Sequence, residues 1–176
     1  MIRVTSVTSL PVVWQIYESS FPRCERRSRS QHERAVRSAD TFYCKQFVLD
    51  TEIVGLLFYW ELPQCLFIEH LAVAEPWRGR GVGTAALKWL QKQGKLLILE
   101  IEPPQDAATC RRREFYQNAG FELLPYVHEQ LPFHADTHSV PMRLMSWPHA
   151  ATAEEIDNFE NALRDNIMRY SDALTN

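Results

Sequence analysis

Long apolar runs are missing from this sequence of 176 residues. No stretch approaches the ~20 apolar residues that a membrane-spanning helix requires, so we expect no membrane partner. The N-terminus, M-I-R-V-T-S-V-T, lacks a basic segment followed by an apolar one, and we therefore expect no signal peptide. The length favours one domain with a full hydrophobic core.

The chain has few cysteines and no excess of positive charge. The four cysteines lack C-x-x-C spacing, which argues against a disulfide framework or a zinc site and favours a reducing cytoplasm. They are Cys24, Cys44, Cys65 and Cys110. The 19 lysines and arginines stand against 22 aspartates and glutamates, for a net charge of −3. This balance argues against a nucleic-acid partner.

Glycine occurs only six times, yet three of these residues fall in one short segment. In L-A-V-A-E-P-W-R-G-R-G-V-G-T, residues 71–84, Gly79, Gly81 and Gly83 stand at the predicted start of a helix. Such a run leaves backbone N–H groups free at a helix N-terminus, where the helix dipole adds a partial positive charge. Arg78 and Arg80 add full charges. The segment therefore predicts a pyrophosphate-binding loop.

The spacing of apolar residues predicts a mixed α/β fold. We expect helices at 11–20, 31–38 and 107–118, and another from Gly83 to a capping Gly94. The expected strands are 42–49, 53–60, 66–73, 96–101, 121–127 and 139–147. Strand, helix and strand follow one another from Leu66 to Ile101, which predicts one parallel step in a mostly antiparallel sheet.

The C-terminal segment is expected to form an amphipathic helix. Thr152-Ala-Glu-Glu155 has the pattern of a capping box, and apolar residues recur at helical spacing after it. We divide the chain into a domain at 1–150 and this helix at 151–176. The helix packs either on its own domain or on a partner.

Three nucleotide-binding motifs compete for the glycine run. A P-loop requires a lysine followed by Ser or Thr, and no lysine is present there. A dinucleotide fingerprint requires G-x-G-x-x-G, but Thr84 stands at the third glycine position. Glu100 and Glu102 lie at about the right distance to hold a ribose, so an NAD(P)-dependent oxidoreductase remains an alternative.

The third motif points to an acyl-CoA site. Arg-x-x-Gly-x-Gly, from Arg78 to Gly83, resembles the acyl-CoA loop of the GNAT superfamily of N-acetyltransferases. The Leu-Ala-Val of residues 71–73 and R-R-E-F-Y-Q-N-A-G-F, residues 112–121, resemble the same family. The resemblance covers roughly residues 40–147. It implies a GNAT-like α/β fold and transfer of an acetyl group from acetyl-CoA to a primary amine.

The resemblance also implies where acetyl-CoA binds. The pantetheine arm would pair with the backbone of the strand before the loop, and the pyrophosphate would rest on N–H groups of the loop. The implied cofactor-binding residues are Leu71, Val73, Arg78, Gly79, Arg80, Gly81, Val82, Gly83 and Thr84. The amine would attack the thioester directly in a ternary complex, without a metal.

Glu69 is our candidate for the general base. Strand alternation predicts that it shares a face with Phe67, Leu71 and Val73, near the acyl end of the cofactor. An apolar strand should raise the pKa of this carboxyl, as suits a base. The alternative is an ion pair with an arginine of the basic segment at 21–37, which otherwise forms a solvated helix face or recruits an acidic acceptor.

Tyr116 is our candidate for the general acid. In the family motif F-Y-x-x-x-G-F, the tyrosine protonates the leaving thiolate, and Phe115-Tyr116 and Gly120-Phe121 match this motif. The alternative is a tyrosine that only packs in the core. Two positions depart from the family pattern, since Thr109 replaces the usual asparagine and Arg112 the usual alanine. Arg111, Arg112 and Arg113 could instead hold cofactor phosphates.

The acceptor should enter from the opposite side of the strands, between segments 21–37 and 126–137. We expect Phe21, Glu102 and Tyr126 to contact a small-molecule or peptide amine. The sequence does not name the amine, and the protein could act as a monomer or homodimer. A non-catalytic acyl-CoA-binding or regulatory domain on the same fold is an alternative function.

Histidines in the last third of the chain suggest a metal site only superficially. His128-Glu129 begins like H-E-x-x-H, but Pro132 occupies the second histidine position. The surrounding prolines also argue against a helix there. We therefore expect no metal.

Overall fold

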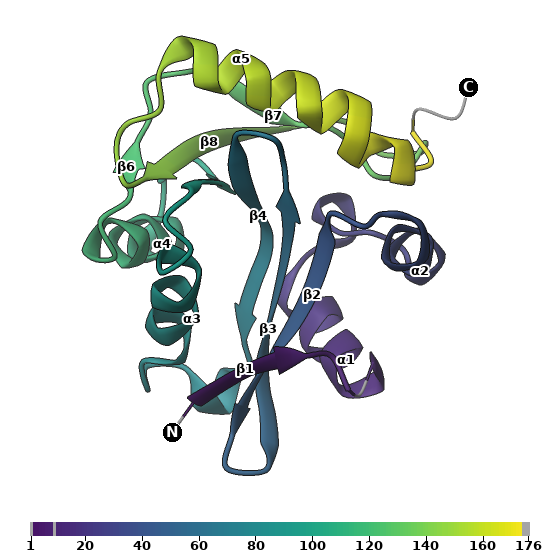
Figure 1. Cartoon of the computed structure of the whole chain (residues 1–176), viewed down its shortest axis with the longest axis vertical. Helices are drawn as coiled ribbons and strands as arrows, with labels where there is room; N and C mark the ends of the chain where they lie inside the picture. Colours follow the sequence, from purple (N-terminus) through teal and green to yellow (C-terminus); the bar gives the residue numbers. More distant parts are fainter. Residues whose placement is uncertain (1, 9, 174–176) are drawn as a thin grey trace.

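The computed structural model describes residues 2–8 and 10–173 and confirms a mixed α/β fold around a twisted sheet (Figure 1). The strands follow the order β1-β2-β3-β4-β5-β8-β6, and β7 pairs with β8. Among the described strands, only β4 and β5 pair in parallel, as the sequence predicts. The strand bounds are β1 Ile2–Ser6, β2 Phe42–Leu49, β3 Glu52–Glu61, β4 Cys65–Val73, β5 Leu96–Ile101, β6 Glu122–Leu123, β7 His128–Gln130 and β8 Val140–Trp147.

Helices cover both faces of this sheet (Figure 1). Helices α3 and α4 lie on one face, α1 and α2 on the other, and α5 crosses the end near β8. The helix bounds are α1 Leu10–Ser20, α2 Arg29–Ser38, α3 Val82–Gln91, α4 Ala107–Asn118 and α5 Ala153–Ala162. Two 3₁₀ turns, η1 Arg23–Glu25 and η2 Glu75–Trp77, precede α2 and α3.

Alternating strand residues build a separate core on each face of the sheet. On one face, Phe58 and Phe67 pack with residues of α1 and α5. On the other face, Leu57 and Ile68 pack with the apolar side of α3, including Leu87. Burial of apolar area on both faces stabilises the sheet at roughly 25 cal/mol per Å².

The ends of the sheet depart from the sequence prediction. The sequence patterns missed β1, which pairs antiparallel with β2 at the edge of the sheet. The strand predicted at 121–127 is instead the short β6, followed by an irregular segment and then β7. Pro125 lies in this segment, and proline cannot donate a ladder hydrogen bond.

The C-terminal segment packs into the same core as the rest of the chain. The Thr152 hydroxyl accepts from the backbone N–H of Glu155 in a capping box, and α5 begins there. The helix continues as one π turn, Leu163–Ile167, and a 3₁₀ turn, Met168–Tyr170. Phe159 packs against Phe67 of β4 with ring centroids 5.1 Å apart and the rings tilted by 52°. In the described chain, the segment after residue 150 is therefore part of the domain core.

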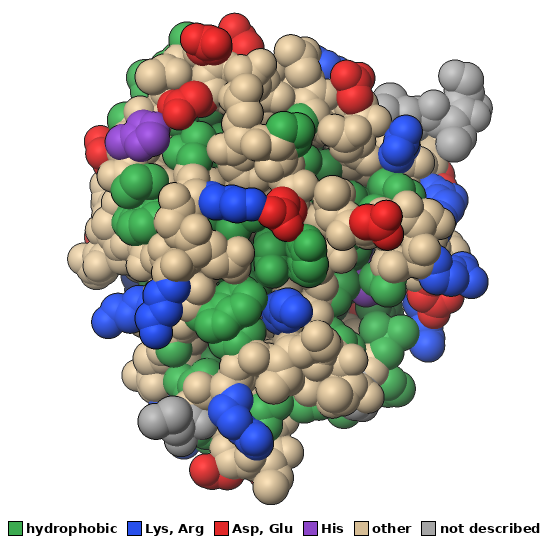
Figure 2. All heavy atoms as spheres, in the orientation of Figure 1, with side chains coloured by type: hydrophobic (Ala, Val, Ile, Leu, Met, Phe, Trp, Pro, Cys, Tyr) green, Lys and Arg blue, Asp and Glu red, His purple; other side chains and the backbone are tan. Residues whose placement is uncertain are grey.

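Charged side chains of both signs are interspersed on the visible surface (Figure 2). Lysines and arginines lie next to aspartates and glutamates, with hydrophobic side chains between them. No helix within residues 2–8 and 10–173 has the length and apolarity to cross a bilayer.

Candidate active site

A β-bulge in β4 opens the sheet. His70 opposes Phe58 and Ile68 opposes Tyr59, so Glu69 has no partner on β3. The parallel pairing with β5 ends at Ile68 and Leu99, although both strands continue further. The two strands therefore separate just after the bulge.

A cleft of about 860 Å³ occupies the gap between the separated strands. It is bounded by β4 beyond the bulge, the loop before α3, and one side of α4. Eight of the nine predicted cofactor-binding residues line it: Leu71, Val73, Arg78, Gly79, Gly81, Val82, Gly83 and Thr84. The size and shape are typical of a cofactor cleft.

The N-terminus of α3 is left uncapped where it meets the cleft. Helices α2, α4 and α5 each begin with a capping box, whereas no side chain caps α3. Its N-cap residue, Gly81, has a φ of 76°, a left-handed conformation that favours glycine. A Cβ on Gly83 would lie 3.0 Å from the Phe115 ring of α4. Free N–H groups at a helix N-terminus form an anion site.

The two arginines of the loop have different surroundings. Arg78 lines the cleft, and its Nε donates to the Val73 carbonyl at 3.1 Å. Arg80 does not line the cleft, and its guanidinium lies 4.8 Å from the centroid of the Trp77 ring. The structure therefore does not bring Arg80 to the predicted site, because a cation–π contact holds its head group against η2.

Glu69 lines the cleft as predicted, but two other parts of its prediction, the shared strand face and the raised pKa, are wrong. The bulge shifts the alternation of β4, so Leu71 and Val73 pack toward α3 while Glu69 lies on the opposite face with Trp60. There the carboxylate pairs with Arg27 at 2.7 Å, and the two side chains are 3% and 0% exposed. The expected sharing of a face holds for Phe67 and fails for Leu71 and Val73, because the bulge inserts one residue.

The electrostatics of Glu69 are also opposite to the prediction. Burial alone would raise the pKa of this carboxyl, but the Arg27 guanidinium and the adjacent His70 outweigh it and lower the pKa to about 2. A carboxylate with a pKa of about 2 is a poor proton acceptor at neutral pH. Glu69 is therefore a buried, ion-paired carboxylate, as the alternative interpretation of the sequence expected.

Tyr116 lies where it was predicted, at the wall of the cleft formed by α4. Burial raises the pKa of its phenol to about 12. Its ring packs against Phe115 and Phe121 with centroid distances of 5.0 and 5.8 Å. In the described chain, no hydrogen bond to its hydroxyl competes with a bound ligand.

The predicted acceptor residues are brought together only in part. Phe21 and Glu102 line the cleft, and Glu102 forms an ion pair with Arg112. Tyr126 lies outside the cleft lining, and its hydroxyl donates to the Ala151 carbonyl at 3.5 Å. The irregular segment between β6 and β7 directs it to the start of α5 instead.

The comparison with known proteins settles the family. The model described as "Acetyltransferase (GNAT) family" matches residues 10–121. The chain belongs to this family. The GNAT protein is thus a member of an acetyltransferase family. The nicotinamide alternative loses its basis, because β4 and β5 are the only parallel pair among the described strands.

Individual relatives agree with this assignment. "Putative acetyltransferase YjbC" of Bacillus subtilis (strain 168) is 27% identical over 155 residues, which are 86% of this chain and 79% of the relative. "Putative acetyltransferase from GNAT family from Bacteroides thetaiotaomicron" is 23% identical, with a TM-score of 0.85 over 94% of this chain and 98% of that chain. A GNAT family acetyltransferase from Elizabethkingia anophelis, solved with acetyl-CoA bound, is 15% identical, with a TM-score of 0.57 over 82% and 96% of the two chains.

Sequence patterns missed two carboxylates that line the cleft of this GNAT protein. Glu25 of η1 lines it, and burial together with the charge of Glu100 raises the pKa of the Glu25 carboxyl against the opposing effects of Arg112 and His70. Glu100 of β5 also lines the cleft, and the sequence suggested it only as a ribose ligand. The sequence signal that could have identified Glu100 is a single carboxylate near the end of an otherwise apolar strand.

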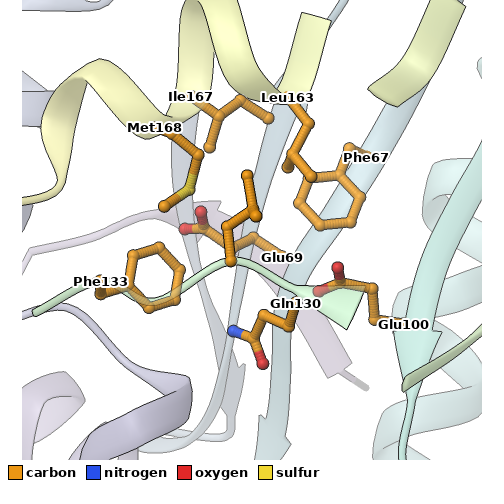
Figure 3. Close-up of a pocket in the computed structure, with 9 residues that line it drawn as sticks. Phe67, Glu69, Glu100, Gln130, Phe133, Leu163, Ile167 and Met168 are labelled. Atoms are coloured by element: carbon orange, nitrogen blue, oxygen red, sulfur yellow. The ribbon is translucent and has the colours of Figure 1, made fainter. Parts of the chain in front are cut away.

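The C-terminal segment closes the back of the site. A small cavity of about 10 Å³, near the lower limit for one water molecule, lies between Glu69 and Glu100. Figure 3 shows Leu163, Ile167 and Met168 of this segment above the two carboxylates. The same segment that follows α5 therefore contacts the back of both strands that form the cleft.

The walls predicted for the acceptor lie side by side. Arg23 pairs with Asp136 at 2.9 Å, which joins segment 21–37 to segment 126–137. His134 of this second wall hydrogen-bonds the Arg26 carbonyl at 3.0 Å. Within residues 2–8 and 10–173, no cluster of three or more His, Cys, Asp or Glu residues is arranged to hold a metal ion.

Proposed function

We propose that this GNAT protein transfers the acetyl group of acetyl-CoA to a primary amine within a ternary complex. The observation that carries the proposal is the uncapped N-terminus of α3, which opens on the cleft between β4 and β5 next to Tyr116. One end of the cleft offers an anion site and the other end offers acid–base groups. A CoA thioester matches this arrangement, because it carries phosphates at one end and the reactive thioester at the other.

In the proposed complex, the pyrophosphate accepts hydrogen bonds from N–H groups of residues 79–84, and Arg78 adds charge. The pantetheine arm lies along Leu71 and Val73. The Val73 carbonyl already accepts from Arg78, but a carbonyl oxygen has a second lone pair for a pantetheine N–H. Arg111 and Arg112 also line the cleft and supply further charge for phosphates.

The neutral amine attacks the thioester carbon, a C–N bond forms, and the C–S bond breaks. The nitrogen then loses its surplus proton, which restores the Tyr116 phenol after that phenol has protonated the sulfur. Tyr116 donates its phenolic proton to the departing thiolate. With a pKa of about 12, the phenol is protonated at neutral pH and holds the proton until negative charge develops on sulfur. A backbone N–H of β4, our candidate being that of Val73, donates to the thioester oxygen.

The amine must first lose a proton, and we propose Glu100 rather than Glu69 as the acceptor of that proton. Both carboxylates line the cleft, but Glu100 of β5 pairs with the titratable His128 at 2.6 Å and has no arginine partner among the described residues. Glu69, in contrast, is neutralised by Arg27. The geometry therefore favours the carboxylate of β5 as the general base.

The acceptor end of the cleft supports a cationic amine. Glu25 and Glu100 give it negative charge, and Phe21 and Met142 give it an apolar surface. This combination suits an ammonium on an apolar stem, whether of a small molecule or a peptide.

The proposal is tested in two steps with the purified protein. Thermal-shift titration should show stabilisation by acetyl-CoA and none by NAD, and absence of stabilisation by any CoA species overturns the proposal. Release of free CoA thiol is then measured against a panel of primary amines. Glu100→Gln should lower turnover about 100-fold while leaving acetyl-CoA stabilisation intact. Acetyl-CoA binding without thiol release for any amine would indicate a non-catalytic acyl-CoA-binding domain instead.

A further inference from the structure

A buried histidine connects the cleft to the C-terminal helix. His128 of β7 has Nε2 2.6 Å from Oε1 of Glu100 and Nδ1 3.3 Å from Oε1 of Glu160, on α5. The histidine side chain is 3% exposed, Glu100 is 9% exposed, and Glu160 is 31% exposed. The three side chains thus form a line from the cleft, through the core, to the surface.

The hydrogen-bond partners of the His128 ring indicate its protonation state. An ionised carboxylate accepts hydrogen bonds and cannot donate them. A neutral imidazole carries one N–H, so it can donate to only one of the two carboxylates. An imidazolium carries two N–H groups and can donate to both at once. The arrangement with a carboxylate at each nitrogen therefore matches the charged ring.

Within residues 2–8 and 10–173, the charged groups paired with His128 are two carboxylates. The charged groups that face the ring are Glu100 from β5 and Glu160 from α5. The other neighbours are apolar: Met142 is its cross-strand partner on β8, and Phe159 of α5 lies 6.2 Å from its ring. Two negative groups and an apolar surrounding leave the imidazolium as the local source of positive charge.

We propose that His128 is a positioning residue that, as an imidazolium, holds the Glu100 carboxylate toward the acceptor, and that Glu160 keeps the ring charged. The inference rests on the proposed role of Glu100 in amine deprotonation. It assigns a catalytic consequence to α5, an element that does not line the cleft. Loss of the imidazolium proton would remove the charge and one of the two hydrogen bonds.

The sign of the pH dependence follows from the surroundings of the ring. Burial would lower the pKa of His128, but hydrogen bonds and charge from Glu100 and Glu160 outweigh it, so the pKa is raised. The charged form is therefore present at low pH and is lost as pH rises through this raised value. Activity should show a descending limb on the alkaline side when Glu100 loses its charged partner.

The first test measures the ring itself and needs no turnover. A ¹H–¹⁵N imidazole NMR titration of the wild-type protein should give His128 a pKa above 6.5. Glu160→Gln should lower that midpoint by on the order of one pH unit, because an adjacent opposite charge is removed. Asp157→Asn, also on α5 and exposed, is the matched control and should leave the midpoint unchanged. An unchanged midpoint in Glu160→Gln overturns the proposal.

The second test measures the pH profile of kcat/KM for amine acetylation. Glu160→Gln should move the alkaline limb to lower pH in parallel with the NMR midpoint. His128→Gln keeps a donor but cannot titrate, so this limb should disappear, whereas His128→Ala should lose about tenfold or more in kcat/KM. A limb that stays in place in both Glu160→Gln and His128→Gln overturns the positioning role. Failure of the proposed acetyl transfer is distinguishable, because the NMR midpoints would shift as stated without any thiol release.

Discussion

Arg27 and Glu69 form a buried ion pair that fastens the bulge of β4 to the N-terminal and C-terminal segments. The guanidinium donates to the carboxylate at 2.7 Å and to the Tyr170 carbonyl at 3.2 Å. The guanidinium carbon, Cζ, lies 4.6 Å from the centroid of the Phe133 ring. One side chain thus joins the strand at which the sheet opens to the segment that closes the back of the site.

Removal of one partner of this ion pair should destabilise the fold. Arg27→Met leaves the Glu69 carboxylate buried without its main counter-charge, and we expect a loss of about 3–5 kcal/mol in the free energy of unfolding. Urea denaturation followed by circular dichroism measures it. Arg29→Met is the matched control, since its pair with Glu33 is exposed and should contribute less than about 0.5 kcal/mol. Equal losses in the two variants would contradict a buried role for Arg27.

The same pair predicts the acid stability of the fold. The pKa of Glu69 is lowered from 4.5 to about 2, so its stabilising contribution is complete above pH 4.5 and is lost as pH falls toward 2. We expect a loss on the order of 3 kcal/mol over this window from this group. Glu69→Gln, which cannot titrate, should show a flatter dependence of unfolding free energy on pH there. Identical slopes for the variant and the wild type would contradict the lowered pKa.

Tyr116→Phe tests the proposed general acid. The ring contacts with Phe115 and Phe121 remain, so stability should change little, while kcat should fall by roughly 100-fold without a matching rise in KM for acetyl-CoA. Steady-state thiol release provides both constants. Tyr126→Phe is the control, because Tyr126 lies outside the cleft lining and should retain full turnover. Full activity in Tyr116→Phe would remove the acid assignment.

Substitution of two glycines at opposite ends of α3 distinguishes an effect on CoA binding from an effect on fold stability. Gly81 and Gly94 both have positive φ, 76° and 69°, and a Cβ on either meets no atom within 4 Å. Alanine at either position should therefore destabilise the fold by a similar amount, about 1 kcal/mol. Only Gly81→Ala should weaken CoA binding, by tenfold or more in isothermal titration calorimetry, because Gly81 lies at the proposed pyrophosphate site. Equal CoA affinities in the two variants would argue against a pyrophosphate site at Gly81.

Much of the fold and half of the site follow from local patterns. The glycine run, the Phe115-Tyr116 pair and the capping box at Thr152 are contiguous, so their spacing predicts the α3 loop, the position of Tyr116 and the start of α5. Strands β2 to β5 also follow from apolar periodicity and turn residues. Each of these features depends on residues within a few positions of one another.

The remaining features depend on partners distant in sequence. Six arginines of segment 21–37 look alike in the sequence, and only packing selects Arg27, 42 residues from Glu69, as its partner. Likewise, the spatial order places β5 beside β8, and β7 pairs with β8, which brings His128 to Glu100. A pattern within one segment does not carry this information.

The sequence alone therefore determined the family, the parallel step, and the places of the glycine loop and Tyr116 at the cleft, because these rest on short-range spacing. Only the tertiary structure decided the role of Glu69. A single inserted residue in β4 has no clear signature in its apolar pattern, yet it places Glu69 and Leu71 on opposite faces of the sheet. Burial next to Arg27 then holds the Glu69 carboxylate in an ion pair, whereas Glu100 of β5 lines the same cleft without an arginine partner among the described residues.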